Sequence, residues 1–380
     1  MIKFLDLSMQ YSEIRAEHEA AIGRVLSSCQ FVQGEEVDLF EKEFAAYLGI
    51  KYCIGVSSGT DALLLSLVAL DIKAGDEVLL PTNTFIATAL AVVHAGGIPI
   101  FVDVDFSTMN LSYRSALLEV TPKTKFLIPV HLYGNPAPMD SLCKLAADNN
   151  LIIIEDACQG FGGAYKGKPL GTIGAAGCYS MFPSKNLGCF GDGGAIVTDD
   201  EELAEKLRYL RNYGQTSKNS HYYLGYNHRL DSIQAAVLRV NLKYVDAWVK
   251  RRAELAALYS SLLENLVIQV PFEGSMSAEE AISSTLENES RHAWHLYVPK
   301  VHARDELREF LFKSGIETQI HYPTPCHLQP CFDYLDPFFL KTAEYLSQKI
   351  VSLPLHPSMT EADVLLVCKR IFEFYMGKTA

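Results

Sequence analysis

A lysine surrounded by small and hydroxyl-bearing residues offers the clearest chemistry in this chain. Lys185 follows Ser180 and Ser184 in the run CYSMFPSKNLG, and four glycines follow soon after it. Upstream, the apolar run Leu151–Ile154 predicts a buried strand that ends in Glu155 and Asp156. A lysine amine can form a Schiff base with an aldehyde, and a carboxylate can keep a pyridine nitrogen protonated. Lys185 alone could be a surface lysine before a glycine turn, but together with Asp156 it predicts a pyridoxal phosphate (PLP) site.

A second segment offers a place for a phosphate group. The expected strand Tyr52–Val56 leads into Ser57–Thr60, and an apolar helical pattern begins there. Free N–H groups and the positive dipole end of a helix N-terminus attract anions, and Thr60 adds a hydroxyl. Because Ser and Thr are also the usual helix-capping residues, an ordinary N-cap is the alternative interpretation of this turn.

Taken together, these segments resemble the DegT/StrS family of PLP-dependent sugar aminotransferases. The similarity is most specific in Pro183–Leu187 and Gly191–Ala195. In order and spacing, the similar segments span nearly the whole chain: Gly55–Leu64, Asp76–Thr88, Glu155–Gly163, Ser180–Asp199, Gly225–Ala236 and Gly315–Gln329.

The resemblance implies roles for four residues around the cofactor ring. Lys185 would form the Schiff base, and Asp156 would pair with the pyridinium nitrogen. Gln159 stands where the family places a hydrogen bond to the ring hydroxyl. Phe85 stands where an aromatic side chain stacks on the ring, although a plain core position is the competing interpretation for Phe85.

The resemblance also implies a phosphate site and a dimer. Gly59, Thr60 and Ser180 match the family's phosphate ligands. Asn227 matches an asparagine that reaches the phosphate held by the neighbouring subunit, which implies a homodimer with shared active sites. Alternatively, Asn227 could be a helix-start residue before a cap at Asp231.

Two features separate this chain from related groups. Members that dehydrate deoxysugars carry histidine where this chain has Lys185, so the lysine indicates transamination. Other relatives hold an iron–sulfur cluster on clustered cysteines, but the nine cysteines here contain no C-x-x-C pair. We therefore expect no metal, and interpret the cysteines as buried small residues in a reducing compartment.

The segment Gly315–Gln329 is similar to members that aminate dTDP-linked 3-keto-6-deoxyhexoses. Its His321 and Tyr322 suit a nucleotide-sugar wall, and the planar guanidinium of Arg229 could bind the diphosphate. A structural histidine is the alternative for His321. The turn Ser57–Thr60 also resembles members acting on UDP-linked sugars, so a UDP-linked 3-keto or 4-keto substrate stays open. L-glutamate is the amino donor that the family implies.

Composition agrees with a globular enzyme. The chain has 380 residues, 49% of them hydrophobic and 21% charged, and this length predicts two lobes. A net charge of −12 disfavours binding to nucleic acid or an anionic membrane. The N-terminus lacks the pattern of a signal peptide, and no run of about 20 apolar residues predicts a membrane span. We expect a cytoplasmic protein.

Apolar runs that alternate with helical patterns predict a mostly parallel sheet between helices. The expected strands are 52–56, 77–80, 98–102, 124–129, 151–155, 177–180 and 195–198. A long helix is expected from Asp231 past Arg251, and a polar loop at 274–291 before a strand at Trp294–Val298. The resemblance implies the aspartate-aminotransferase-like fold (fold type I). It has a large PLP-binding domain, 1–247, and a smaller C-terminal α+β domain, 248–380.

Two other classes of protein remain as alternatives. A nicotinamide oxidoreductase would need the glycines after Lys185 to form a dinucleotide loop, but their spacing is not G-x-G-x-x-G and a strand is expected next. A non-catalytic regulator with a PLP fold would not need Lys185, Asp156 and Gln159 together.

Overall fold

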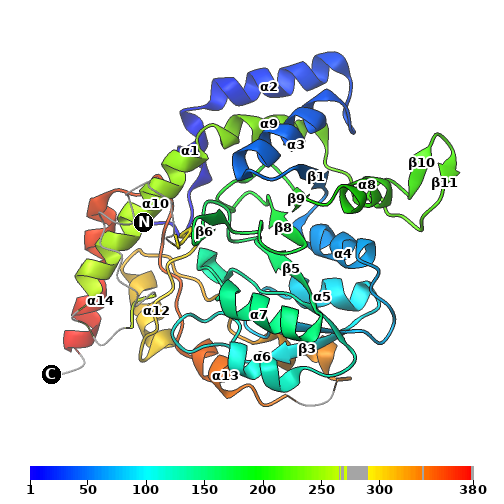
Figure 1. Ribbon diagram of the computed structural model, residues 1–380. Coiled ribbons are helices and arrows are strands. Elements are labelled where there is room, and N and C mark those ends of the chain that lie inside the picture. Colours follow the sequence, from blue (N-terminus) through cyan, green and yellow to red (C-terminus); the bar gives the residue numbers. More distant parts are fainter. Residues whose placement is uncertain (265, 267–268, 272–289, 336–337, 378–380) are drawn as a thin grey trace.

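The computed structural model describes residues 1–264, 266, 269–271, 290–335 and 338–377. Its centre is a seven-stranded sheet with the order β1-β9-β8-β5-β4-β2-β3 (Figure 1). Neighbouring strands run parallel from β3 to β8, and β9 is antiparallel to both of its neighbours. The strands are β1 (Tyr52–Val56), β2 (Glu77–Pro81), β3 (Ile98–Val102), β4 (Thr124–Leu127), β5 (Ile152–Asp156), β8 (Ala176–Ser180) and β9 (Gly194–Thr198). The mostly parallel sheet and its expected strands are confirmed.

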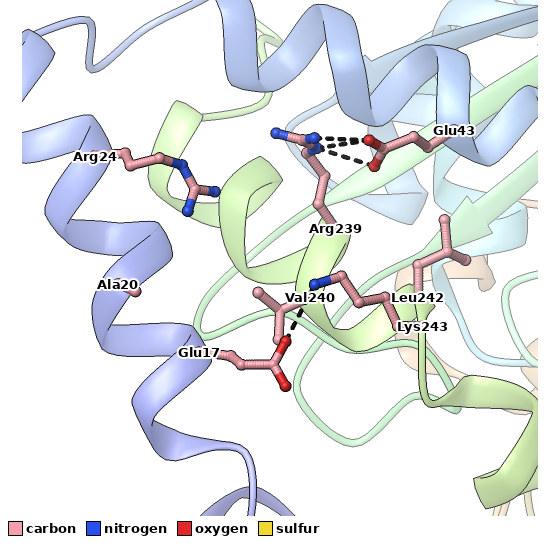
Figure 2. A pocket seen from close by; sticks show the side chains of 8 residues that line it. All are labelled: Glu17, Ala20, Arg24, Glu43, Arg239, Val240, Leu242 and Lys243. Carbon is pink, nitrogen blue, oxygen red and sulfur yellow. Dashed lines mark hydrogen bonds and ion pairs between the residues drawn. The ribbon is translucent and has the colours of Figure 1, made fainter.

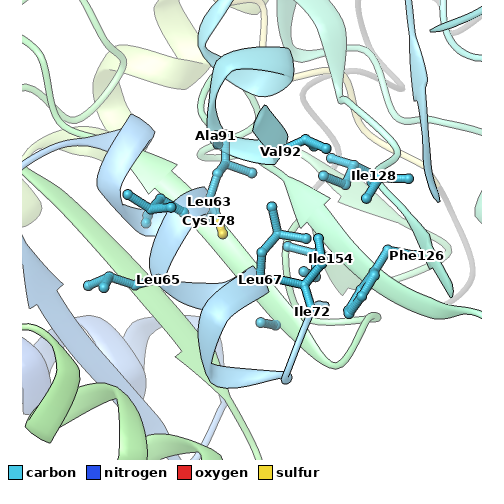
Figure 3. Packing of buried hydrophobic residues seen from close by; sticks show 14 of the residues in the cluster. Leu63, Leu65, Leu67, Ile72, Ala91, Val92, Phe126, Ile128, Ile154 and Cys178 are labelled. Atoms are coloured by element: carbon cyan, nitrogen blue, oxygen red, sulfur yellow. The ribbon is translucent and has the colours of Figure 1, made fainter. Parts of the chain in front are cut away.

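Helices cover both faces of the sheet, so alternate strand residues enter different cores. Helices α4, α5 and α8 pack on one face, where Ile154 of β5 joins a large apolar cluster (Figure 3). Helices α6 and α7 cover the other face, where Ile153 is buried. Burial on both faces explains why the strands are continuous apolar runs in the sequence. These helices are α4 (Gly59–Ala69), α5 (Ala87–His94), α6 (Tyr113–Glu119), α7 (Met139–Asn149) and α8 (Glu201–Leu210).

The remaining helices include two groups that pack outside the two faces of the sheet. Helices α2, α3 and α9 pack together beside β1, whereas α10, α12 and α14 contribute to a separate apolar cluster. They are α1 (Leu7–Ser12), α2 (Arg15–Ser28), α3 (Glu35–Leu48), α9 (Ser232–Leu242), α10 (Val245–Leu263), α12 (Arg304–Lys313), α13 (Lys341–Ser347) and α14 (Glu361–Gly377). The small hairpins β6–β7 (Ala164–Tyr165, Lys168–Pro169) and β10–β11 (Gln215–Ser217, Ser220–His221) complete the fold, and β10–β11 projects beyond α8 (Figure 1). No helix in the described part of the chain is long and apolar enough to cross a membrane.

Two expected elements differ in the structure. The long helix after Asp231 is interrupted between α9 and α10, where the side chains of Lys243 and Tyr244 both bind Glu17 of α2. The expected strand at Trp294–Val298 is wrong, because Trp294 has a left-handed φ of 49° that breaks the extended chain. Residues 274–289 of the expected polar loop lie outside the described residues.

A buried ion pair closes the outer edge of the sheet at β1. The Gly55 N–H donates to Glu41 Oε1 at 2.8 Å, and Arg211 Nη1 donates to the Gly55 carbonyl at 2.7 Å. Glu41 and Arg211 also bind each other, and about a tenth or less of each side chain is exposed. The pair therefore satisfies backbone groups that an additional strand would otherwise satisfy.

Replacing Arg211 alone should destabilise the protein strongly. Arg211→Met leaves Glu41 buried without its cation, and breaking a buried pair costs roughly 3–5 kcal/mol. Urea unfolding followed by circular dichroism measures the change. The control Lys144→Met removes an exposed pair with Asp148 and should shift the urea midpoint far less. Equal shifts in the two variants would contradict the structural role of the buried pair.

Candidate active site

The carboxylate expected to meet a cofactor ring lies at the end of β5 and is held rigidly. Asp156 is 5% exposed. Its Oδ2 accepts a hydrogen bond from Thr88 Oγ1 at 2.7 Å, and its Oδ1 accepts one from the Cys158 N–H at 3.1 Å. These bonds satisfy a buried charge and fix the orientation of the carboxylate. Thr88 was not among the predicted site residues, although it lies within one of the family-like segments.

Lys185 lies in the loop between β8 and β9. Its side chain is half-buried, and its backbone N–H donates to the Phe182 carbonyl at 2.8 Å in a tight turn. Among the described residues, none makes a hydrogen bond or an ion pair with its amine. Burial lowers the pKa of Lys185, and the nearby Cys158 and Asp156 offset part of this effect. The site thus holds an unpaired amine that is more readily neutral than an exposed lysine.

The turn expected to bind phosphate is packed against the end of β8. Helix α4 begins at Gly59, and its cap Ser58 accepts a hydrogen bond from the Asp61 N–H at 3.1 Å. A Cβ atom on Gly59 would lie 2.7 Å from the Cβ of Ser180, so only glycine fits between the turn and the strand. The turn therefore brings Gly59, Thr60 and Ser180 together at one helix N-terminus, the arrangement that anion binding requires.

Gln159 links three aromatic residues into one wall of the site. Its Oε1 accepts a hydrogen bond from the Tyr133 N–H at 2.6 Å, and its Nε2 donates to the Tyr322 hydroxyl at 3.1 Å. The rings of Tyr322 and Phe85 lie 5.9 Å apart. Phe85 is 54% exposed, which excludes the interpretation as a plain core residue within this chain. Tyr133 was also not predicted. The available sequence signal was the turn-forming run Tyr-Gly-Asn-Pro, in which the structure gives Tyr133 a left-handed φ of 60°.

His321 continues this wall. Its Nδ1 lies 2.7 Å from Ser352 Oγ, and its ring stacks on Phe4 at 5.8 Å. Its backbone carbonyl accepts a hydrogen bond from the Tyr133 hydroxyl. Burial, with a smaller contribution from Lys185, lowers the pKa of His321 to about 4. The imidazole is therefore neutral at physiological pH.

Two predicted site residues lie away from this wall within a single chain. The Asn227 side chain is exposed, and its backbone pairs with Asn212. Arg229 Nη1 donates to Asn212 Oδ1 at 3.0 Å, and its guanidinium lies 5.3 Å from the centre of the Tyr213 ring. The contacts of Arg229 thus lie beside the projecting β10–β11 hairpin, whereas His321 and Tyr322 lie beside Gln159.

A pocket elsewhere on the surface has different chemistry. It has a volume of about 520 Å³ and lies between α2, α3 and α9 (Figure 2). Arg239 in this pocket binds Glu43 with bonds of 2.7–3.1 Å, and Lys243 binds Glu17 at 3.1 Å. Because these cations are already paired, we place the active site at the strand ends and not in this pocket.

The residues at the strand ends fit pyridoxal phosphate. They provide an unpaired lysine amine, a fixed carboxylate and an exposed aromatic ring. They also provide a helix N-terminus at Gly59, where only a glycine fits against Ser180. The sequence comparison agrees: residues 12–372 match the DegT/DnrJ/EryC1/StrS aminotransferase family. The chain belongs to this family, whose members are PLP-dependent sugar aminotransferases.

Similar proteins cover almost the full length of the chain. A "dTDP-3-amino-3,4,6-trideoxy-alpha-D-glucose transaminase" from Streptomyces venezuelae is 43% identical, covering 98% of this chain and 96% of the relative. A "Pleiotropic regulatory protein" from Geobacillus stearothermophilus is 41% identical, covering 98% of each. A "UDP-N-acetyl-3-dehydro-alpha-D-glucosamine 3-aminotranferase" from Acidithiobacillus ferrooxidans is 39% identical, covering 96% and 95%.

The solved structures include a similar chain in a reacting state. The crystal structure of S. venezuelae DesV "in complex with ketimine intermediate" superposes with a TM-score of 0.93 at 43% identity, covering 98% of each chain. The expected fold class is thereby confirmed.

The lowered pKa of Lys185 predicts its reactivity in the cofactor-free protein. A low pKa leaves more neutral amine at a given pH, so labelling by acetic anhydride should have its pH midpoint below 10.5. Peptide mass spectrometry across a pH series measures this midpoint. In Asp156→Asn the midpoint should fall further, because the carboxylate that favours the ammonium form is gone. A midpoint that rises in Asp156→Asn would contradict the electrostatic arrangement.

Proposed function

We propose that this enzyme aminates carbon 3 of a nucleotide-linked 3-keto-6-deoxyhexose, with dTDP as the carrier and L-glutamate as the amino donor. The observation that carries this proposal is the unpaired, half-buried Lys185 amine beside the fixed carboxylate of Asp156. The full-length similarity to a transaminase of a dTDP-linked 3-amino sugar supports the carrier and the position of amination.

When bound, pyridoxal phosphate supplies an aldehyde that links to amines and a ring that takes up electron density. Lys185 holds this group covalently through its amine and, once released, moves a proton to or from the amino-bearing carbon as general base and acid. Its lowered pKa provides the neutral amine that both tasks require. Asp156, held by Thr88 and the Cys158 N–H, stabilises a positive charge on the ring nitrogen.

The other predicted residues would hold the cofactor from its remaining sides. Gly59, Thr60 and Ser180 would bind the phosphate at the N-terminus of α4. Gln159 would hydrogen-bond the ring hydroxyl, and Phe85 would stack on the ring.

We propose a homodimer in which Asn227 completes the phosphate site of the other subunit. Its exposed side chain supports this role. The segment that follows β11 also carries exposed large side chains, with Tyr222 78% and Leu224 95% exposed. Arg229, on the same segment, would then reach the substrate diphosphate across the interface, opposite His321 and Tyr322.

The remaining proposals concern domains and location. We divide the chain into a PLP-binding domain, 1–247, and a C-terminal domain, 248–380, because α10, α12 and α14 share an apolar cluster of their own. We place the protein in the cytoplasm, since all nine of its cysteines are free and suit a reducing compartment.

A substrate-discharge experiment tests the proposed reaction. The protein carrying the amino form of the cofactor is mixed with dTDP- and UDP-linked 3-keto and 4-keto sugars. The return of visible absorbance reports amino transfer. We expect the dTDP-linked 3-keto sugar to react fastest, and Lys185→Ala to lose turnover by several orders of magnitude.

The other outcomes distinguish the alternatives. Discharge by a 4-keto sugar alone would overturn the position of amination, and preference for UDP would overturn the carrier. The relative named as a regulatory protein favours a second candidate, a non-catalytic regulator. Cofactor binding without turnover on any of these sugars would support that candidate.

Mixing two inactive variants tests the shared site. Lys185→Ala loses the amine, and Asn227→Ala loses the contact made across the interface, so each homodimer should be nearly inactive. After subunit exchange, mixed dimers should recover some activity, because one of their two sites contains both native residues. Sedimentation supplies the control: a fully active monomer would refute the proposed dimer.

A further inference from the structure

The loop that carries Lys185 is anchored to helix α9 by a buried amide. The Asn241 side chain is 0% exposed, and its Nδ2 donates to the Gly188 carbonyl at 2.7 Å. The backbone at Gly188 packs directly against that of Pro183 in the same loop, because a Cβ atom on Gly188 would lie 2.7 Å from the Pro183 carbonyl oxygen. A shift of Gly188 would therefore move the turn from which Lys185 projects.

The N-terminal helix α2 determines which way this amide points. His18 is 3% exposed, and its Nε2 lies 2.7 Å from Asn241 Oδ1. An amide group offers one accepting end and one donating end of similar shape. When His18 Nε2–H donates to the oxygen, the NH₂ group must face Gly188. The reverse orientation would place two carbonyl oxygens together and would leave a buried acceptor unsatisfied.

Aromatic rings enclose His18 and limit its contact with water. The ring of Phe190 lies 4.8 Å from the His18 ring, and that of Tyr11 lies 5.5 Å away, both nearly edge-on. Phe190 follows Lys185 in the same loop, and its backbone N–H donates to Gln234 Oε1 of α9 at 2.8 Å. The loop is thus anchored to α9 at two points, and only the buried point depends on His18.

We propose that His18 is a positioning residue for the reaction: through Asn241 and the Gly188 carbonyl, it holds the Lys185 loop in the geometry that linkage to the cofactor needs. This inference rests on the proposed role of Lys185. It assigns a function to α2, which contributes no residue to the predicted cofactor or substrate contacts.

Four variants separate positioning from general stability. His18→Leu removes the donor, whereas His18→Gln retains an N–H near the position of Nε2. Asn241→Asp keeps the acceptor for His18 but cannot donate to Gly188. His356→Leu is the control, since His356 is an equally buried histidine outside the α2–α9 contact. The readouts are hydrogen exchange of peptide 182–190 in the cofactor-free protein, the rate of covalent linkage after addition of pyridoxal phosphate, and the melting temperature.

We expect His18→Leu and Asn241→Asp to slow covalent linkage and to speed exchange of peptide 182–190 by about tenfold or more, the factor that one lost buried hydrogen bond predicts. His18→Gln should restore both rates to within about twofold. His356→Leu should leave both rates unchanged, whatever its melting temperature.

Three results would overturn the proposal. These are wild-type rates in His18→Leu, no rescue by His18→Gln, or equal effects of His356→Leu. Failure of the proposed function is recognised separately. Borohydride reduction followed by peptide mapping would then place the cofactor on a lysine other than Lys185, while exchange of the loop would still report the His18–Asn241 contact.

Discussion

The structure depends on the burial of two adjacent carboxylates at the end of β5. Glu155 is fully buried and accepts hydrogen bonds from His131 Nε2 at 2.9 Å and from three backbone N–H groups of residues 171–174 at 2.6–3.0 Å. Burial acts to raise the pKa of Glu155, but these donors hold it below its usual value. Because a buried charge without partners would cost several kcal/mol, the loops on this side must fold around Glu155, and Asp156 is thereby fixed on the opposite face of the strand.

The fixed carboxylate of Asp156 lies near the Lys185 amine, and this amine has no partner of its own among the described residues. In the described chain, the two oxygens of Asp156 bind Thr88 and the Cys158 N–H, and no group binds the Lys185 amine. Buried polar groups normally find partners, so an unpaired amine in a half-buried position indicates a site prepared for a ligand. The loop around Lys185 is held from outside, by Asn241 and Gln234 of α9.

The exposed side chains around the site have a related explanation. Phe85, Phe182 and Phe190 are each between 43% and 54% exposed, although they belong to segments that are otherwise well packed. An aromatic ring exposed at a ligand site gains its apolar contacts from a cofactor, a substrate or a second subunit. The proposed cofactor and dimer would cover the exposed parts of these rings, and the exposed chain next to the β10–β11 hairpin would supply a surface for the proposed subunit contact.

The strands of the central sheet, the turn that begins α4, and the placing of Asp156 and Lys185 after strands could be predicted from the sequence, because they follow from local patterns of burial and from motifs within a few residues. The strand expected at Trp294–Val298 was wrong, because the φ of Trp294 depends on packing. Tertiary structure alone decided that Thr88 binds Asp156, that Tyr133 joins Gln159 to His321, and that the long helix breaks before Tyr244. Each of these depends on a contact between residues far apart in the chain. Periodicity records only which face of an element is buried, and the partner across the contact is set by how the elements pack.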